Sequence, residues 1–173
     1  MSQPPLLIAT NILPRISRRD YPDHRLVDAA LTRLRSTGTN LYYTHQNISE
    51  FWNVATRPVN RNGFGLSVAD VELETRAIER EMILLPDSAA VYQEWRRLVF
   101  AHSVSVVQVH DARLAAAIKV HAVSLLLTLN PDDFRRHGHV IPIHPRQLSQ
   151  EGVAGASAKA APRPNTCHRA TRI

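Results

Sequence analysis

The residues of this sequence that are best suited to chemistry are carboxylates that each follow an apolar, strand-like segment. They are Glu50, Asp111, Asp132 and Asp133. Carboxylates that converge in one cleft repel each other, and a bound cation removes that cost. Oxygen ligands without cysteine favour Mg²⁺ or Mn²⁺, and such an ion can position a phosphate and activate water for hydrolysis. The residue types therefore predict a divalent-metal site that acts on a phosphate ester, provided that the fold brings the carboxylates together.

Each of these carboxylates also has an ordinary structural interpretation. Asp111 suits the N-cap of the Ala-rich helical segment that it opens, a role that could coexist with metal binding. Glu50 could be a solvated helix residue, and Asp133 could cap the turn before Phe134. The positions of the carboxylates in the sequence leave both interpretations open.

The histidines, glycines and aromatic residues of the sequence are weaker candidates for a functional site. Four histidines share no helical i, i+4 ligand spacing and are expected at the surface or at caps; they are His45, His102, His110 and His121. The sequence has no Gly-rich loop of the kind that binds phosphate. Four aromatic residues occupy core-like positions in helical patterns: Phe51, Trp52, Tyr92 and Trp95. A platform on which bases of single-stranded RNA stack is therefore not expected.

Strands and helices that alternate along the chain would position the carboxylates. Short apolar segments predict strands at residues 6–9, 41–44, 82–85, 124–128 and 140–143. Helical spacing of apolar residues predicts helices at 12–18, 24–36, 47–56, from 67, from 88 and at 111–121. Such alternation predicts an α/β fold, a three-layer sandwich around a central, mostly parallel sheet. Ligands of such folds bind at the carboxyl ends of the strands, which is where the carboxylates would lie.

The composition fits one basic domain followed by a tail. A length of 173 residues and a hydrophobic content of 44% suffice for one core. The net charge of +6 makes a polyanionic partner worth considering. Half of that charge falls in residues 151–173, which are rich in Ala, Gly, Pro and Ser. We therefore expect a folded domain over residues 1–148 and a disordered basic tail over residues 149–173.

The chain also has few features of a secreted or membrane protein. Cys167 is the only cysteine of the sequence, which excludes an internal disulfide and a Cys-based zinc site. The longest apolar run, at 123–129, is much too short to span a membrane. The first residues lack the charged and apolar regions of a signal peptide. We expect a cytoplasmic protein without a membrane partner.

Four segments follow one another in a pattern that belongs to a known family. They read LLIATNIL at 6–13, THQNISEFWNVATRP at 44–58, VQVHDARLAAAIKVHAV at 107–123 and LLLTLNPDDF at 125–134. In this order and at these spacings, the chain from residue 6 to about residue 145 resembles the PIN-domain nucleases, especially the VapC-type toxins of type II toxin–antitoxin systems. No segment is specific alone, but together they cover most of the predicted domain.

The resemblance implies a metal-dependent endoribonuclease that hydrolyses RNA phosphodiester bonds with Mg²⁺ or Mn²⁺. It further implies a cognate antitoxin as partner and a homodimer. The residues that carry over as catalytic are Glu50, Asp111, Asn130 and Asp133, and the three carboxylates among them are the implied metal ligands. Three neighbouring residues carry over as supporting groups that organise the site: Thr10, Asn11 and Thr128.

The chain departs from the family pattern at Ala9. The family has Asp-Thr-Asn where this chain reads Ala9-Thr10-Asn11, and a methyl group cannot bind a metal. Loss of one ligand could lower the rate roughly a thousandfold or more. Three explanations are compatible with the sequence. Ala9 is natural in a weakened or inactive nuclease, it is an engineered substitution, or a neighbour such as Asp20 or Asp23 replaces the missing carboxylate.

Two functional hypotheses follow from the resemblance and from this departure. The first is a toxin ribonuclease, impaired or inactive because of Ala9. The second is a catalytically silent PIN-like module that binds RNA or an antitoxin. Flanking arginines that could hold the RNA backbone are Arg15, Arg57, Arg113 and Arg135, and solvated surface residues are the alternative for all four.

Overall fold

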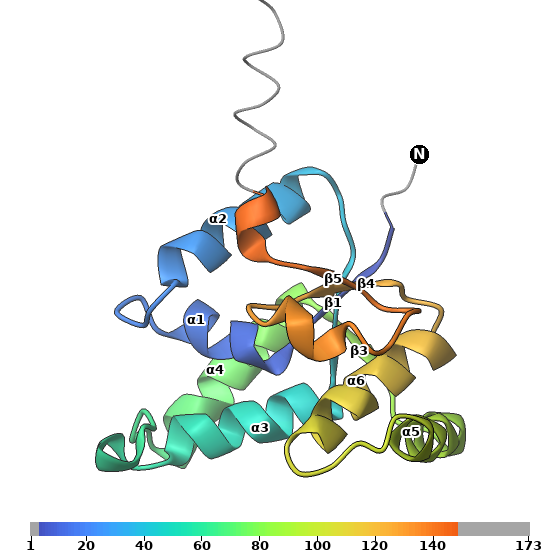
Figure 1. Cartoon of the computed structure of the whole chain (residues 1–173). Helices are drawn as coiled ribbons and strands as arrows, with labels where there is room; N and C mark the ends of the chain where they lie inside the picture. Colours follow the sequence, from blue (N-terminus) through green and yellow to red (C-terminus); the bar gives the residue numbers. More distant parts are fainter. Residues whose placement is uncertain (1–3, 149–173) are drawn as a thin grey trace, which may run out of the picture.

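Five short apolar strands pair into one parallel sheet (Figure 1). The computed structural model describes residues 4–148, so the predicted tail at 149–173 lies outside the described residues. The strands are β1 (Leu6–Ile8), β2 (Leu41–Thr44), β3 (Ile83–Leu85), β4 (Leu125–Leu127) and β5 (Ile141–Ile143). Their order across the sheet is β3-β2-β1-β4-β5, and all four neighbouring pairs are parallel. The central parallel sheet confirms the predicted fold class.

The helices cover both faces of this sheet. They are α1 (Leu13–Ser17), α2 (His24–Ser36), α3 (His45–Thr56), α4 (Val68–Glu81), α5 (Ala89–Ala101) and α6 (Gln108–Val120). Short 3₁₀ turns η1 (Thr10–Ile12), η2 (Val59–Arg61) and η3 (Pro131–Phe134) complete the described part of the chain. Figure 1 shows α5 and α6 on one side of the sheet and α1 to α4 on the other. Within residues 4–148, no helix is long and apolar enough to cross a membrane.

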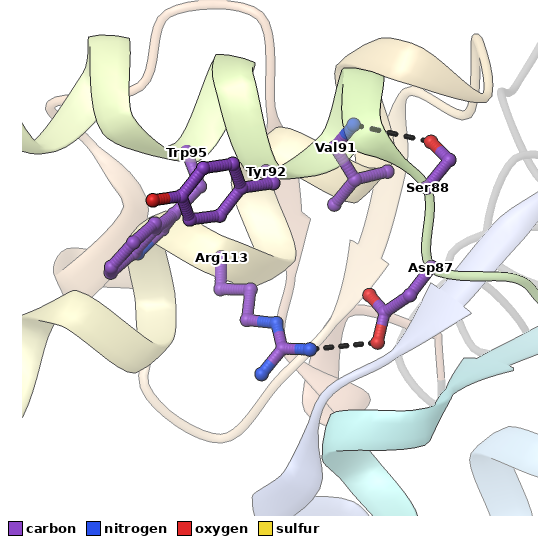
Figure 2. Close-up of a pocket in the computed structure, with 6 residues that line it drawn as sticks. All are labelled: Asp87, Ser88, Val91, Tyr92, Trp95 and Arg113. Atoms are coloured by element: carbon purple, nitrogen blue, oxygen red, sulfur yellow. Dashed lines mark hydrogen bonds and ion pairs between the residues drawn. The ribbon is translucent and has the colours of Figure 1, made fainter.

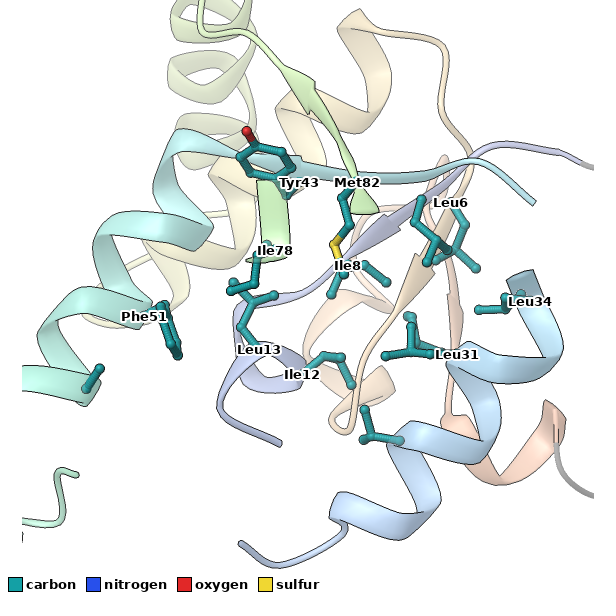
Figure 3. Close-up of a cluster of buried hydrophobic side chains, with 14 of the residues drawn as sticks. Leu6, Ile8, Ile12, Leu13, Leu31, Leu34, Tyr43, Phe51, Ile78 and Met82 are labelled. Atoms are coloured by element: carbon teal, nitrogen blue, oxygen red, sulfur yellow. The ribbon is translucent and has the colours of Figure 1, made fainter. Parts of the chain in front are cut away.

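The central strand β1 explains why the core has two halves. Successive side chains of a strand point to opposite faces, and all three residues of β1 are fully buried. Leu6 and Ile8 pack into a cluster with residues of α1 to α4, including Phe51 (Figure 3). Leu7 packs into a second cluster with α5 and the Ala-rich α6. A strand that is buried on both faces reads as a continuous apolar run, and β1 does.

Two helix starts differ from the sequence-based expectation by more than one residue. α3 begins at His45 because Thr44 caps it: the Thr44 hydroxyl accepts from Asn47 N at 3.3 Å, and Asn47 Oδ1 accepts from Thr44 N at 2.7 Å. α6 begins at Gln108, one turn before Asp111, so the prediction of Asp111 as N-cap is wrong. Backbone bonds of the i→i−3 type, such as Gln108 N to Ser105 O at 3.2 Å, form that earlier turn.

Candidate functional site

A cleft of about 590 Å³ lies at the carboxyl ends of β1, β2 and β4. We call it the acidic cleft. All four residues that carried over as catalytic line it: Glu50 from α3, Asp111 from α6, and Asn130 and Asp133 from the segment after β4. Residues 9–11 after β1 also line it, so three strand ends contribute to one site. The fold thus brings together carboxylates that are up to 83 residues apart, from Glu50 to Asp133.

Hydrogen bonds between strand ends fix the floor of the acidic cleft. Asn11 Nδ2 donates to Thr128 Oγ1 at 3.1 Å, and Leu129 N donates to Asn11 Oδ1 at 3.2 Å. Thr128 Oγ1 also accepts from Asn130 N at 3.1 Å. Thr128 itself is fully buried. Asn11 and Thr128 therefore join the end of β1 to the end of β4.

Thr10 makes the corresponding connection to α3. Asn47 Nδ2 donates to Thr10 Oγ1 at 3.0 Å, and Asn47 is the fully buried residue that completes the cap of α3. Glu50 lies one turn further along the same helix. The position of the Glu50 backbone is thus tied to β1 through two side chains, Thr10 and Asn47.

Gln46 and His110 contact Glu50, and sequence reasoning assigned neither of them to the site. Gln46 Nε2 donates to Glu50 Oε1 at 2.8 Å and to His110 O at 3.0 Å. His110 Nδ1 lies 3.1 Å from Glu50 Oε1. Gln46 Oε1 is buried without a partner among the described residues. In the sequence, the spacing of four residues between Gln46 and Glu50 indicates this contact, because residues four apart lie on the same face of a helix.

The carboxylates in the acidic cleft act on each other electrostatically. The pKa of Asp111 is raised to about 6, first by burial and then by the negative charges of Asp133 and Glu50. His110 and Arg136 oppose this shift and do not cancel it. A carboxyl group with a pKa displaced by burial and by like charges marks a candidate functional position. The structural interpretation of Asp111 as a simple cap therefore does not hold.

Solved structures that share this fold at low sequence identity include several toxin–antitoxin proteins. No family model and no curated protein matches the chain. VapBC2 of Rickettsia felis, bound to a promoter DNA fragment, superposes with a TM-score of 0.61 at 12% identity, over 81% of this chain and 98% of that one. For DNA-bound VapBC of Salmonella typhimurium the TM-score is 0.62 at 10% identity, over 83% and 99%. VapC20 of Mycobacterium tuberculosis, a sarcin–ricin loop cleaving toxin, gives 0.51 at 14% identity, over 70% and 86%.

This chain has the VapC-type PIN fold. The predicted resemblance is thereby confirmed at the level of the fold. The acidic cleft lies at the edge of this sheet that carries the carboxyl ends of the strands.

Ala9 lies at the end of β1, in the middle of the acidic cleft. It is buried, lines the cleft, and its N–H donates to Leu127 O at 2.9 Å. Neither Asp20 nor Asp23 lines the cleft. Asp20 pairs with Arg18 at 2.8 Å on the surface. The explanation that one of these neighbours replaces the missing carboxylate is therefore wrong.

The side chains of the acidic cleft are of the types that bind a divalent cation, but in this structure they lie too far apart to hold one together. Glu50, Asp111, Asp133 and the amide of Asn130 offer the hard oxygen ligands that Mg²⁺ and Mn²⁺ prefer. Yet among the described residues no three His, Cys, Asp or Glu side chains are close enough together to hold an ion. The carboxylates would have to move closer together to bind a cation, and the methyl group of Ala9 provides no additional ligand.

The four predicted arginines separate into two groups. Arg15 and Arg57 line the acidic cleft. Arg15 Nη1 donates to Asn11 O at 2.9 Å, and its guanidinium lies 4.7 Å from the centre of the Tyr21 ring. Arg135 is exposed and pairs with Asp132 at 2.8 Å, and neither residue lines the cleft. Arg113 lies in another pocket.

That second pocket, of about 340 Å³, lies between α5 and α6 (Figure 2). We call it the aromatic pocket; its lining residues are Asp87, Ser88, Val91, Tyr92, Trp95 and Arg113. Phe51 is in the core as predicted, but Tyr92 is 56% exposed, so its predicted core position is wrong. Val91 and Leu98 form the buried face of α5, which turns Tyr92 outward.

Proposed function

We propose that this chain is the toxin of a toxin–antitoxin pair, a metal-dependent endoribonuclease that hydrolyses RNA phosphodiester bonds. The observation that carries the proposal is the convergence of Glu50, Asp111 and Asp133 on one cleft at the carboxyl edge of the sheet. Charges that raise the pKa of Asp111 to about 6 would be stabilised by a cation. The distant VapC neighbours support the same class of activity, since VapC20 is described as a loop-cleaving toxin.

The residues of the acidic cleft would share the work as follows. Glu50, Asp111 and Asp133 would hold Mg²⁺ or Mn²⁺, with Asn130 as an additional oxygen donor. The ion would supply neutralisation of the phosphate charge and activation of water. Arg15 and Arg57 would bind the RNA backbone from the wall of the cleft. Thr10, Asn11 and Thr128 keep the three strand ends in register through their hydrogen bonds.

We further propose a cognate antitoxin as partner and a homodimer as the assembled form. The antitoxin is supported by the structural neighbours from Rickettsia felis, Salmonella typhimurium and Haemophilus influenzae, which are VapBC complexes. The homodimer rests on the family resemblance alone. These neighbours match at nearly their full length, since the chain covers 98% or more of each.

A second candidate function is a catalytically silent module that binds RNA or an antitoxin. Two observations favour it. Ala9 replaces the carboxylate that the family pattern has at the end of β1, and the described residues include no three ligands arranged for an ion. The two candidates differ in whether the acidic cleft hydrolyses RNA, either as it stands or after a carboxylate is restored at position 9.

The test is an RNA cleavage assay with the chain as it stands and with Ala9→Asp. Structured and single-stranded RNA would be incubated with Mg²⁺, with Mn²⁺ or with EDTA. We expect metal-dependent cleavage by Ala9→Asp that exceeds that of the unchanged chain roughly a thousandfold. Ala9→Ser is the matched control, because it adds a small polar group without a charge and should leave the rate low.

The outcomes separate the candidates. If neither form cleaves any RNA but both bind it, the silent module is correct and the nuclease proposal is wrong. If the unchanged chain cleaves RNA and Asp111→Asn does not lower its rate, the assignment of the acidic cleft is wrong.

A further inference from the structure

The aromatic pocket combines an exposed aromatic surface with a fixed aromatic wall. Tyr92 is 56% exposed, and its ring centre lies 5.9 Å from that of Trp95 at an interplanar angle of 36°. Trp95 Nε1 donates to Val109 O at 2.9 Å, which anchors the indole to the segment that begins α6. A flat ligand that enters the pocket would therefore meet one exposed ring beside one ring that is held in place.

The opposite end of the aromatic pocket carries charged hydrogen-bonding groups. Arg113 Nη2 donates to Asp87 Oδ2 at 2.7 Å (Figure 2), and His45 Nδ1 lies 3.6 Å from the same oxygen. Both partners of Asp87 among the described residues contact Oδ2, so Oδ1 can accept a hydrogen bond from a ligand. Aromatic faces with a polar end match the two parts of a nucleobase, a π-face and a hydrogen-bonding edge.

The aromatic pocket adjoins the acidic cleft through two helices. Arg113 follows Asp111 by two residues on α6, and His45 precedes Gln46 on α3. Gln46 and Asp111 line the acidic cleft, whereas Arg113 lines the aromatic pocket. Helix α6 thus contributes side chains to both sites, and α3 reaches the pocket only through the contact of His45 with Asp87. Asp111 and Arg113 are about 3 Å apart along the axis of α6, so an RNA strand bound in the acidic cleft can extend across this helix to the pocket.

We propose that the aromatic pocket binds one unpaired nucleobase of the RNA whose backbone occupies the acidic cleft. The base stacks on Tyr92 against Trp95, and its edge hydrogen-bonds to Asp87 and Arg113. This inference rests on the proposed function for the identity of the polymer. It adds a base-binding subsite to a nuclease site that otherwise contacts only phosphate and sugar, and such contacts carry no sequence information.

A base explains the pocket better than a protein partner does. An amphipathic partner segment would be expected to cover the apolar outer face of α5, which includes Phe100 at 91% exposure. Phe100 lies outside the aromatic pocket but lines a neighbouring hollow together with Tyr92 and Trp95. The charged pair of Asp87 and Arg113 is partly exposed, so a base edge can reach it. Replacing Phe100 therefore tests whether a ligand lies in the pocket or along the whole outer face of α5.

The test measures RNA binding by fluorescence anisotropy with the full chain. The probe is a short fluorescein-labelled single-stranded RNA in Mg²⁺, checked on a gel for integrity after each titration. The variants are Tyr92→Ala, which removes the stacking surface, and Tyr92→Phe, which keeps it. Phe100→Ala is the matched control, because it removes an exposed aromatic ring from the same helix outside the pocket. Circular dichroism melting verifies that each variant is folded.

We expect Tyr92→Ala to raise the Kd about tenfold or more, while Tyr92→Phe and Phe100→Ala stay within about twofold. A series of probes with one abasic position at a time sharpens the result. With the unchanged chain, removing the base at one RNA position should lower the affinity as much as Tyr92→Ala does. With Tyr92→Ala, removing that same base should cause no further loss of affinity, because the substitution and the missing base remove the same contact.

Three results would overturn the inference, and the first of them leaves the proposed function standing. Unchanged binding by Tyr92→Ala means that the pocket holds no base, although the nuclease proposal stands. Equal losses of RNA affinity in Tyr92→Ala and Phe100→Ala mean that the RNA lies along the whole outer face of α5 and that the pocket holds no single base. Absence of any RNA binding by the unchanged chain refutes the base pocket and the proposed function together.

Discussion

The acidic cleft and the aromatic pocket lie close to each other along α6, but their carboxylates differ in how far they are paired with cationic groups. In the acidic cleft, burial and then the charges of Asp133 and Glu50 raise the pKa of Asp111, and Arg136 opposes this shift without cancelling it. In the aromatic pocket, Asp87 is paired with Arg113 at 2.7 Å. The carboxylate of the pocket is therefore paired with a cationic side chain, whereas Asp111 in the cleft keeps a raised pKa. From this difference we propose that chemistry takes place in the cleft and recognition in the pocket.

The largest expected effect separates these two roles in the Ala9→Asp form. Adding Asp111→Asn should lower kcat roughly a hundredfold or more, since it removes a ligand of the cation. Adding Tyr92→Ala should instead raise KM about tenfold and leave kcat nearly unchanged, since stacking contributes to binding. Steady-state cleavage of a fluorescent RNA measures both parameters. A loss of kcat in Tyr92→Ala as large as that in Asp111→Asn would contradict the division of roles.

The next effect concerns stability and its dependence on pH. Because the folded-state pKa of Asp111 is raised to about 6, its ionisation opposes folding. The neutral form of the Asp111 carboxyl is therefore the form that favours folding. Its contribution to the free energy of unfolding is fully present below the unfolded pKa near 3.8 and is lost as pH rises through about 6. Asp111→Asn should therefore raise the free energy of unfolding by about 1–2 kcal/mol at neutral pH, after allowance for partial solvent screening.

Urea denaturation at neutral and acidic pH measures this gain. It should shrink steadily as the pH falls from about 6 to below about 4, where the wild-type carboxyl is itself neutral. Asp87→Asn is the matched control from the aromatic pocket. It breaks an exposed ion pair and should change stability by less than about 1 kcal/mol. A pH-independent gain in Asp111→Asn would show that the carboxylates do not repel each other as described.

The smallest expected effect lies in the loop that joins α5 to α6, between the two sites. Val106 has a φ of 52° and is 81% exposed. A β-branched residue rarely adopts this left-handed conformation, and asparagine adopts it at lower cost. Val106→Asn should therefore raise the free energy of unfolding by about 1 kcal/mol. Thermal melting measures it, and a lower melting temperature would refute the assignment of strain to this residue.

Most elements of the fold were predictable from short-range patterns, and the errors have local causes. The helix at 24–36 has the predicted bounds, because apolar residues repeat at helical spacing and Gly38 follows its end. The start of α6 was placed three residues late, since Asp111 is a typical capping residue. The helix instead starts in a turn formed by backbone bonds, and side-chain patterns carry no signal for these.

The acidic cleft was largely predictable, and the aromatic pocket was not. The rule that ligands bind at the carboxyl ends of parallel strands brought Glu50, Asp111 and Asp133 together before any coordinates. The assignment of Tyr92 to the core failed because an aromatic residue in a helix gives no indication of which face is buried. Arg113 was expected beside the cleft, but two residues along a helix correspond to a rotation of roughly 200°. That rotation places its side chain in the aromatic pocket.

The central claim, that the acidic cleft is a divalent-cation site weakened by Ala9, is tested most directly by calorimetric titration with Mn²⁺. Three forms would be compared: the unchanged chain, Ala9→Asp, and Ala9→Asp with Asp111→Asn. We predict weak binding by the first, at least about tenfold tighter binding by the second because a carboxylate ligand is added, and loss of that gain in the third. Equal Mn²⁺ affinity in the unchanged chain and Ala9→Asp would contradict the claim.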